Sequence, residues 1–320
     1  MSSLNNTPPS HRTALSVNNK RVIFLDIVRI ILALWILLYH SIIHLHCDYG
    51  FLNVILIHQT IPMTLFFMLS GYSLQMVYGN KSMDDGKAVK NFFFKRLISI
   101  WPLYMVCTIL IIIMNVGAGQ QSIIDNFILF PIEVLGIQSL FPGSLFNYAS
   151  NSGTWFISCL FLGYAMFPIL MRIVDCKWKI RGKVLLLVIL LALWIYISFV
   201  GRKYDVQFMY TNPLMRLLEF FIGMSLANIV VLRLSEVSIY YKPLVYFSNL
   251  AFALYLGQGF VLLPLKYCLK NNLLPSGLSN ILLISVVITS AYIVAIILHE
   301  EVEKPSKQVL TKYLTSVRNR

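Results

Sequence analysis

Two residues that could take part in acid–base and electrostatic chemistry, Arg29 and His40, lie within one apolar stretch, Val22 to Ile43. The stretch is long enough to span a bilayer as a helix, which needs about 20 residues. At 3.6 residues per turn, eleven steps return to within about 20° of the same helix face, roughly 16 Å further along the axis. A charged side chain at membrane depth costs at least about 2.5 kcal/mol on insertion scales. The pair therefore predicts a polar path or pocket inside a helical bundle.

The composition is that of an integral membrane protein. Of the 320 residues 58% are hydrophobic and only 12% are charged, against about 25% charged residues in soluble domains. The net charge of +13 does not indicate nucleic acid as a partner, because the basic residues flank apolar runs and do not cover one face. The bilayer is the expected environment. The five cysteines form no CxxC pair, so we expect neither a disulfide framework nor structural zinc.

The hydropathy pattern predicts an all-α fold, a polytopic transmembrane helical bundle of about eight spans and at most ten. The segment Ile123–Phe141 is excluded from the count because Asp125, Pro131, Glu133 and Gly136 interrupt it, and we interpret it as a re-entrant or interfacial segment. The eight predicted spans are Val22–Ile43, Val54–Val77, Leu97–Val116, Thr154–Val174, Val184–Val200, Asn212–Leu232, Leu244–Leu265 and Leu278–Leu298.

Charge asymmetry orients these spans. With a cytoplasmic N-terminus, the inner segments carry 20 of the 26 Lys and Arg residues and the outer segments carry four. By the positive-inside rule this split predicts eight spans with both termini in the cytoplasm of a multi-pass cell-membrane protein. We expect three regions: a disordered cytoplasmic tail at 1–20, a membrane domain at 21–300 and a basic cytoplasmic tail at 301–320.

The imidazole of His40 is the best candidate for a catalytic base, since a neutral imidazole near neutral pH is ready to accept a proton. Asp26 lies three residues before Arg29, the spacing of a helical ion pair. A zinc site is an open alternative, because His40 and His44 are four residues apart and His46 and His58 follow. No carboxylate or thiol completes a convincing ligand set, so we predict no metal.

Other polar and small residues within the spans fit packing roles. Ser70, Gly71 and Tyr72 form a Ser-Gly-Tyr sequence that permits close approach of two helix backbones. Arg216 and Glu219 are three residues apart and can neutralise each other. Arg96, with Lys95 and Lys90 before it, lies at a cytoplasmic helix end, either as a membrane anchor or as a phosphate clamp for an anionic donor.

Taken in chain order, the sequence motifs of this chain resemble those of the acyltransferase-3 family of integral membrane acyltransferases, which includes O-acetylases of bacterial surface polysaccharides. The resemblance covers Val22 to Pro305. The residues that carry it are Asp26-Ile27-Val28-Arg29 with His40, Phe66-Phe67-Met68-Leu69-Ser70-Gly71-Tyr72, Lys95-Arg96, Pro102-Leu103-Tyr104, Trp155-Phe156-Ile157-Ser158, Phe167-Pro168, Arg216-Leu217-Leu218-Glu219-Phe220, Gly223, Tyr255-Leu256 and Glu303-Lys304-Pro305.

The resemblance implies acyl transfer from cytoplasmic acyl-CoA, usually acetyl-CoA, to a hydroxyl group of a surface or lipid-linked carbohydrate. It implies that Arg29 and His40 form the core pair and that Arg96 helps to hold the donor, with no permanently bound cofactor. This chain departs from the family at Ser99, where a second Arg is common, at Leu160, where a Glu is common, and at Gln258, where a His is common.

The mechanism we expect runs along the Arg29–His40 face. His40 would deprotonate the acceptor hydroxyl, while Arg29 would contact the pantetheine arm or polarise the thioester carbonyl. Two alternatives remain: a carrier or flippase of a glycan or an anionic small molecule, which also uses intramembrane Arg and His, and a family member that has lost its chemistry. The sequence does not fix the acyl group or the acceptor.

Overall fold

The computed structural model of this chain describes residues 23–79, 81–140, 152–175, 178–201, 203, 210–230, 242–274 and 279–318. These residues form helices joined by short connections, and no strand occurs among them. The prediction of an all-helical fold is therefore confirmed. The predicted tail at residues 1–20 lies outside the described residues.

The helices vary in length from single turns to a 32-residue rod. Single-turn 3-10 helices lie at Gly50–Leu52, Gln138–Leu140 and Ser152–Thr154. The remaining elements in chain order are α1 (Ile23–Leu45), α2 (Asn53–Leu56), α3 (Thr60–Tyr78), α4 (Gly86–Gly117), α5 (Ile123–Leu135), α6 (Trp155–Val174), α7 (Ile180–Gly201), α9 (Pro213–Ile229), α10 (Lys242–Gly257), α11 (Gly259–Lys270), α12 (Asn280–Ile297), the π-helix η4 (Leu298–Glu303) and α13 (Lys304–Arg318).

Six of the described helices are long and apolar enough to cross a membrane, and a seventh crossing is present if α10 and α11 form one span bent by 46°. The remaining predicted span corresponds to α9, whose 17 described residues fall short of the roughly 20 that a bilayer requires. The chain is thus a multi-pass membrane protein. The count of eight and the cytoplasmic placement of both termini stay predictions.

Local capping explains two boundaries that differ from the hydropathy pattern. α4 begins at Gly86, eleven residues before the predicted span, because the Asp85 side chain accepts a hydrogen bond from the Lys87 amide, as an N-cap residue does. α5 begins after the Ser122 cap and ends at Gly136, which adopts the left-handed conformation. Its 13 residues extend about 20 Å, too short to cross the hydrocarbon core. The interpretation of this segment as re-entrant or interfacial stays a prediction.

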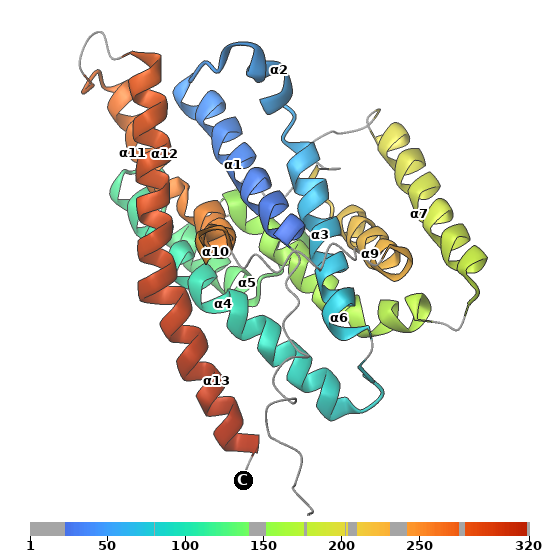
Figure 1. Ribbon diagram of the computed structural model, residues 1–320. Helices are drawn as coiled ribbons and strands as arrows, with labels where there is room; N and C mark the ends of the chain where they lie inside the picture. The colour runs from blue at the N-terminus through green and yellow to red at the C-terminus, as the bar shows by residue number, and fades with distance from the viewer. Residues whose placement is uncertain are drawn as a thin grey trace, which may run out of the picture.

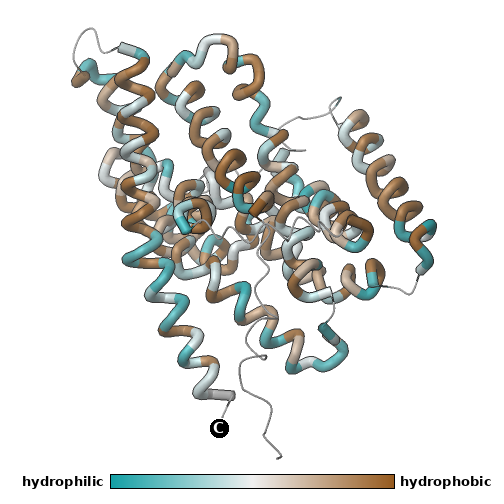
Figure 2. The backbone as a smooth tube through the Cα atoms, in the orientation of Figure 1, coloured by the Kyte–Doolittle hydropathy of each residue, from teal (hydrophilic) through white to brown (hydrophobic). Residues whose placement is uncertain are grey.

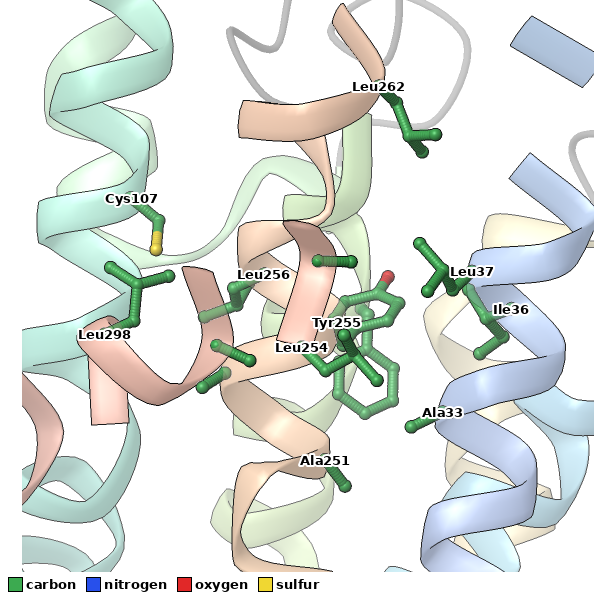
Figure 3. Packing of buried hydrophobic residues seen from close by; sticks show 14 of the residues in the cluster. Ala33, Ile36, Leu37, Cys107, Ala251, Leu254, Tyr255, Leu256, Leu262 and Leu298 are labelled. Carbon is green, nitrogen blue, oxygen red and sulfur yellow. The ribbon is translucent and has the colours of Figure 1, made fainter. Parts of the chain in front are cut away.

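The described helices pack around a core of buried apolar side chains, and Figure 1 shows how the helices are arranged. α12, η4 and α13 run as one long rod along one side, and α7 lies at the opposite edge. α7 is apolar over most of its length, whereas α13 is largely hydrophilic (Figure 2). Figure 3 shows Ala33, Ile36 and Leu37 of α1 facing Ala251 and Leu254 of α10. The core therefore binds the N-terminal helix to helices more than 200 residues later in the chain.

α3 and α9 pack backbone to backbone through two glycines. A Cβ atom at Gly71 would collide with the carbonyl oxygen of Phe220, and one at Gly223 would collide with the carbonyl oxygen of Met68. Because the obstructing atoms belong to the backbone, they cannot rotate away. The close approach expected from the Ser-Gly-Tyr sequence is present, and it requires a residue without a side chain on both helices.

Replacement of Gly71 or Gly223 by Ala should therefore destabilise the bundle. We expect either substitution to lower the free energy of unfolding by about 1–3 kcal/mol, the usual range for an overpacked interior. Thermal unfolding of the purified protein in detergent would measure the change. Gly117→Ala is the matched control, since a Cβ there meets no atom within 4 Å. Equal unfolding temperatures for all three variants would contradict the packing account.

Candidate active site

A cavity of about 750 Å³ lies where six parts of the chain meet. Its wall comes from α1, α3, α4, α6 and α10, and from the segment formed by η4 and α13. The lining is apolar in part, with Phe66, Phe156 and Phe252, but it also holds several charged and hydroxyl side chains. A pocket of mixed character with a few convergent polar groups is the usual form of a small-molecule site.

Arg29 lies in this wall and is held from two sides. Its Nη1 atom donates to the Asp26 carboxylate at 3.2 Å, and its Nη2 atom donates to the Ser73 hydroxyl at 2.9 Å. Asp26 is fully buried and also accepts a hydrogen bond from the Ser248 hydroxyl at 2.7 Å. The network joins α1 to α3 and α10. It fixes the guanidinium at the edge of the cavity, with about a third of the side chain exposed.

Arg96 faces the same cavity from α4 and is held less completely. Its guanidinium lies 5.7 Å from the centre of the Tyr78 ring. Its Nε atom is buried and has no hydrogen-bond partner among the described residues, and no carboxylate in that part of the chain forms an ion pair with it. A buried donor without a partner carries an energetic cost unless a ligand or water satisfies it. Arg96 is therefore well suited to bind an anion.

A second cavity of about 780 Å³ adjoins the first. Arg96 and Tyr164 line both cavities. The second cavity is mostly apolar, but Lys90 and Arg172 also lie in its wall. Lys95 lines neither cavity. Of the three cations expected at the donor site, the structure thus places Arg96 and Lys90 at neighbouring cavities and leaves Lys95 outside them.

The π-helix η4 places an acid–base cluster in the first cavity. Glu303, which is buried, lies 2.7 Å from the Nδ1 atom of His299 and also accepts a hydrogen bond from Lys307. Lys304 lies beside them and pairs with Glu300 at 2.8 Å. All except Glu300 line the cavity. π-helical turns occur often at functional sites.

His40 lies three turns further along α1 than Arg29 and is not among the residues that line this cavity. Its ring stacks on that of His44, with centroids 5.7 Å apart, and meets Tyr39 edge to face. No group of three or more His, Cys, Asp or Glu side chains that could hold a metal ion occurs in the described parts of the chain. The expected path from Arg29 to His40 stays a prediction.

The other residues selected from the sequence fall into two groups. Ser70 and Tyr255 line the cavity, as do Ser99 and Leu160 at positions where the chain departs from the family pattern. The remaining residues support the helices around it. Tyr72 donates to the Val230 carbonyl and Ser158 accepts from the Ser139 amide, Gly71 packs on α9, and Trp155 and Gln258 are buried.

Sequence reasoning missed the wall formed by η4 and α13. His299, Glu303 and Lys307 follow one another at intervals of four residues, as do Glu300 and Lys304. This spacing is the signal of a helix with paired charges. From the sequence, Lys307 is predicted only as a charge that orients the membrane spans, and Glu303 and Lys304 are noted only for their resemblance to the family, because all three follow the last apolar stretch.

Arg216 and Glu219 form a buried ion pair away from the cavity. Their atoms Nη1 and Oε2 are 2.6 Å apart. Thr64 and Trp194 donate to the second oxygen of Glu219, and the Nε atom of Arg216 donates to the Tyr210 carbonyl. The pair joins α9 to α3 and α7 with both charges satisfied. This environment supports the structural role expected for the pair.

Comparison with known proteins identifies the family to which this chain is similar. A family model described as an acyltransferase domain, that of the acyltransferase-3 family, matches residues 22–243. Over 235 residues the chain is 25% identical to the acyltransferase MdmB of Streptomyces mycarofaciens. The match covers 68% of this chain and 58% of that relative, so it leaves over a third of the relative unmatched. No solved structure matches.

The buried ion pair gives a second stability prediction. Arg216→Met should lower the free energy of unfolding by about 3–5 kcal/mol, because it leaves the Glu219 carboxylate buried without a cation. The double variant Arg216→Met/Glu219→Leu removes both charges and should recover most of that loss. Thermal unfolding in detergent measures both. If the double variant were as unstable as the single one, an unpaired charge would not be the cause.

Proposed function

Because this chain belongs to the acyltransferase-3 family of integral membrane acyltransferases, we propose that it transfers an acyl group from cytoplasmic acyl-CoA to a carbohydrate hydroxyl. Acetyl-CoA is the donor that we expect, and a surface polysaccharide or a lipid-linked glycan is the acceptor. The observation that carries the proposal is the partly apolar, partly polar cavity whose wall includes both Arg29 and Arg96. It combines cations that suit phosphate groups with apolar and hydroxyl side chains that suit a pantetheine arm.

Arg96 is the expected contact for the donor phosphates. An arginine presents several N–H groups in a planar fork and forms strong charge-assisted hydrogen bonds with phosphate oxygens. The partnerless Nε atom of Arg96 supports such a contact. Lys90, in the adjoining cavity, would add positive charge at the mouth of the site.

Arg29 and His40 are the residues to which we assign the chemistry. With Arg29 fixed by Asp26 and Ser73, the guanidinium can contact the pantetheine arm without first reorganising. The thioester would then extend along α1 toward His40, about 16 Å further along the helix axis. His40 would take the proton of the acceptor hydroxyl as that oxygen attacks the carbonyl carbon. The carbon–sulfur bond then breaks, and the proton from His40 passes to the solvent or to the departing thiolate.

Label transfer tests the function directly. The purified protein in lipid nanodiscs should move radiolabelled acetyl from acetyl-CoA to a carbohydrate fraction prepared from the host's surface glycans. Mass spectrometry of the acceptor should then show the mass of one added acetyl group. Movement of the glycan across a vesicle membrane without modification would identify a carrier, and an absence of both activities would contradict the proposal.

The role of His40 predicts a loss of activity without a loss of structure. His40→Ala should reduce acetyl transfer at least about 100-fold, the lower range for removal of a general base, while acetyl-CoA binding is retained. His44→Ala is the matched control, since it removes the stacked neighbour of His40 and leaves the proposed base in place. Transfer at the wild-type rate in His40→Ala would remove His40 from the mechanism.

The role of Arg96 predicts a loss of donor affinity. Arg96→Gln should weaken CoA binding about tenfold or more, because a charge-assisted contact to phosphate contributes roughly 1.5–3 kcal/mol. Lys95→Gln is the control, because Lys95 is the residue next to Arg96 in the chain and its side chain lines neither cavity. Isothermal titration calorimetry on nanodisc samples measures both. Equal losses in the two variants would mean that only the general positive charge of this helix end matters.

A further inference from the structure

Three buried polar residues near the end of α10 each carry a side-chain oxygen that has no hydrogen-bond partner in the described part of the chain. We call them the polar cluster: Thr108 of α4, Gln138 of the single turn Gln138–Leu140, and Gln258 at the bend between α10 and α11. They are 0%, 4% and 8% exposed, in that order. A buried oxygen without a donor has a free-energy cost, which water or a ligand with O–H or N–H groups removes.

Gln138 is connected to α10 through two successive carbonyl groups. Its Nε2 atom donates to the Thr154 carbonyl at 2.8 Å. The Tyr255 hydroxyl donates to the Gly153 carbonyl at 3.0 Å. One turn later, the Nε2 atom of Gln258 donates to the Tyr255 carbonyl at 3.0 Å, which leaves Oε1 of this amide as the free acceptor. Gln138 therefore lies beside the last turn of α10.

Thr108 faces the same region from α4. Tyr104, one turn earlier, accepts a hydrogen bond from the amide of Gln138 at 3.5 Å. Ile111, three residues later, lies against the start of α11, because a Cβ atom at Gly259 would be 3.1 Å from its Cδ1 atom. Residues 104, 108 and 111 share one face of α4. Thr108 is therefore placed between Gln138 and the bend that separates α10 from α11.

The register of α1 against α10 places the polar cluster at the depth of His40. Ala33 faces Ala251, and residue numbers increase in the same direction along both helices (Figure 3). His40 follows Ala33 by seven residues, and Gln258 follows Ala251 by seven. Seven residues make about two helical turns, so each residue returns to the face that its helix turns toward the other. His40 and Gln258 thus lie at the same level on facing sides of two parallel helices.

We propose that the polar cluster binds hydroxyl groups of the carbohydrate acceptor, next to the hydroxyl that His40 deprotonates. This inference rests on the proposed function. A sugar presents several O–H donors in different directions, and the three free oxygens belong to three separate elements of the fold. None of the three side chains is charged, which suits a neutral polyhydroxyl ligand. Tyr255, beside the cluster, also lines the cavity assigned to the donor, so the acceptor would meet the thioester at the end of that cavity.

Acceptor kinetics of two variants of similar volume test the assignment. Gln258→Leu and Thr108→Val each remove one oxygen acceptor. In nanodiscs with saturating labelled acetyl-CoA, each should raise the half-saturating concentration of the host glycan fraction about three- to tenfold, the effect of one neutral hydrogen bond. Affinity for CoA, measured by isothermal titration calorimetry, should stay at the wild-type value. Thr108→Ser keeps the hydroxyl and should remain within about twofold of wild type.

Gln121→Leu is the matched control. Gln121 also has a buried amide oxygen without a partner among the described residues, but it lies beyond the end of α4, away from the polar cluster. Its half-saturating glycan concentration should equal that of the wild type. An equal rise in this variant would show an effect without relation to the site and would overturn the assignment.

The remaining outcomes separate acceptor binding from its alternatives. Reduced CoA affinity in the two variants would show structural damage and overturn the assignment. Unchanged glycan half-saturation in both, with a wild type that transfers label, would show that these oxygens bind internal water only and would overturn this inference alone. A wild type that transfers no label would overturn the proposed function as well. Where one variant does not fold, the other decides by the same criteria.

Discussion

The structure depends on a carboxylate buried near one end of the first helix. Asp26 has no exposed surface, and a buried charge costs several kcal/mol unless it is paired and hydrogen-bonded. Here Arg29 supplies the opposite charge and Ser248 supplies a hydrogen bond, while Ser73 binds the other end of the guanidinium. The requirement to satisfy Asp26 thus connects three helices and holds a cation at the cavity. The same side chains stabilise the fold and prepare the site.

The cavity exists because helices far apart in the chain are brought together there. α1 packs along α10, and α4 lies against η4 and α13, so residues 29, 96 and 307 face one space. The glycine contact between α3 and α9 and the buried pair of Arg216 and Glu219 lie on other helix faces. They rigidify the part of the bundle that supports Ser70 and Ser73. The network around Asp26 therefore holds the cation at the cavity, while the glycine contact and the Arg216–Glu219 pair stabilise a different part of the bundle.

Much of this arrangement followed from the sequence, and the failures have identifiable causes. Helical periodicity placed Asp26 beside Arg29, and small residues predicted the close contact of α3 with α9. Hydropathy could not show that α4 begins at Gly86, because its first turns are polar and depend on the Asp85 cap. It also gave no reason to bring residues 299–307 back to the cavity. They follow the last apolar stretch, and only tertiary packing shows that the rod continues past Arg96.

The central claim is that the cavity between Arg29, Arg96 and the η4–α13 wall holds the acyl donor. Electron cryomicroscopy of the protein in nanodiscs with a non-hydrolysable acetyl-CoA analogue tests it most directly. We predict density for the nucleotide phosphates beside Arg96, with the arm running toward Arg29. Density for the analogue at another place on the protein, with this cavity empty, would contradict the account.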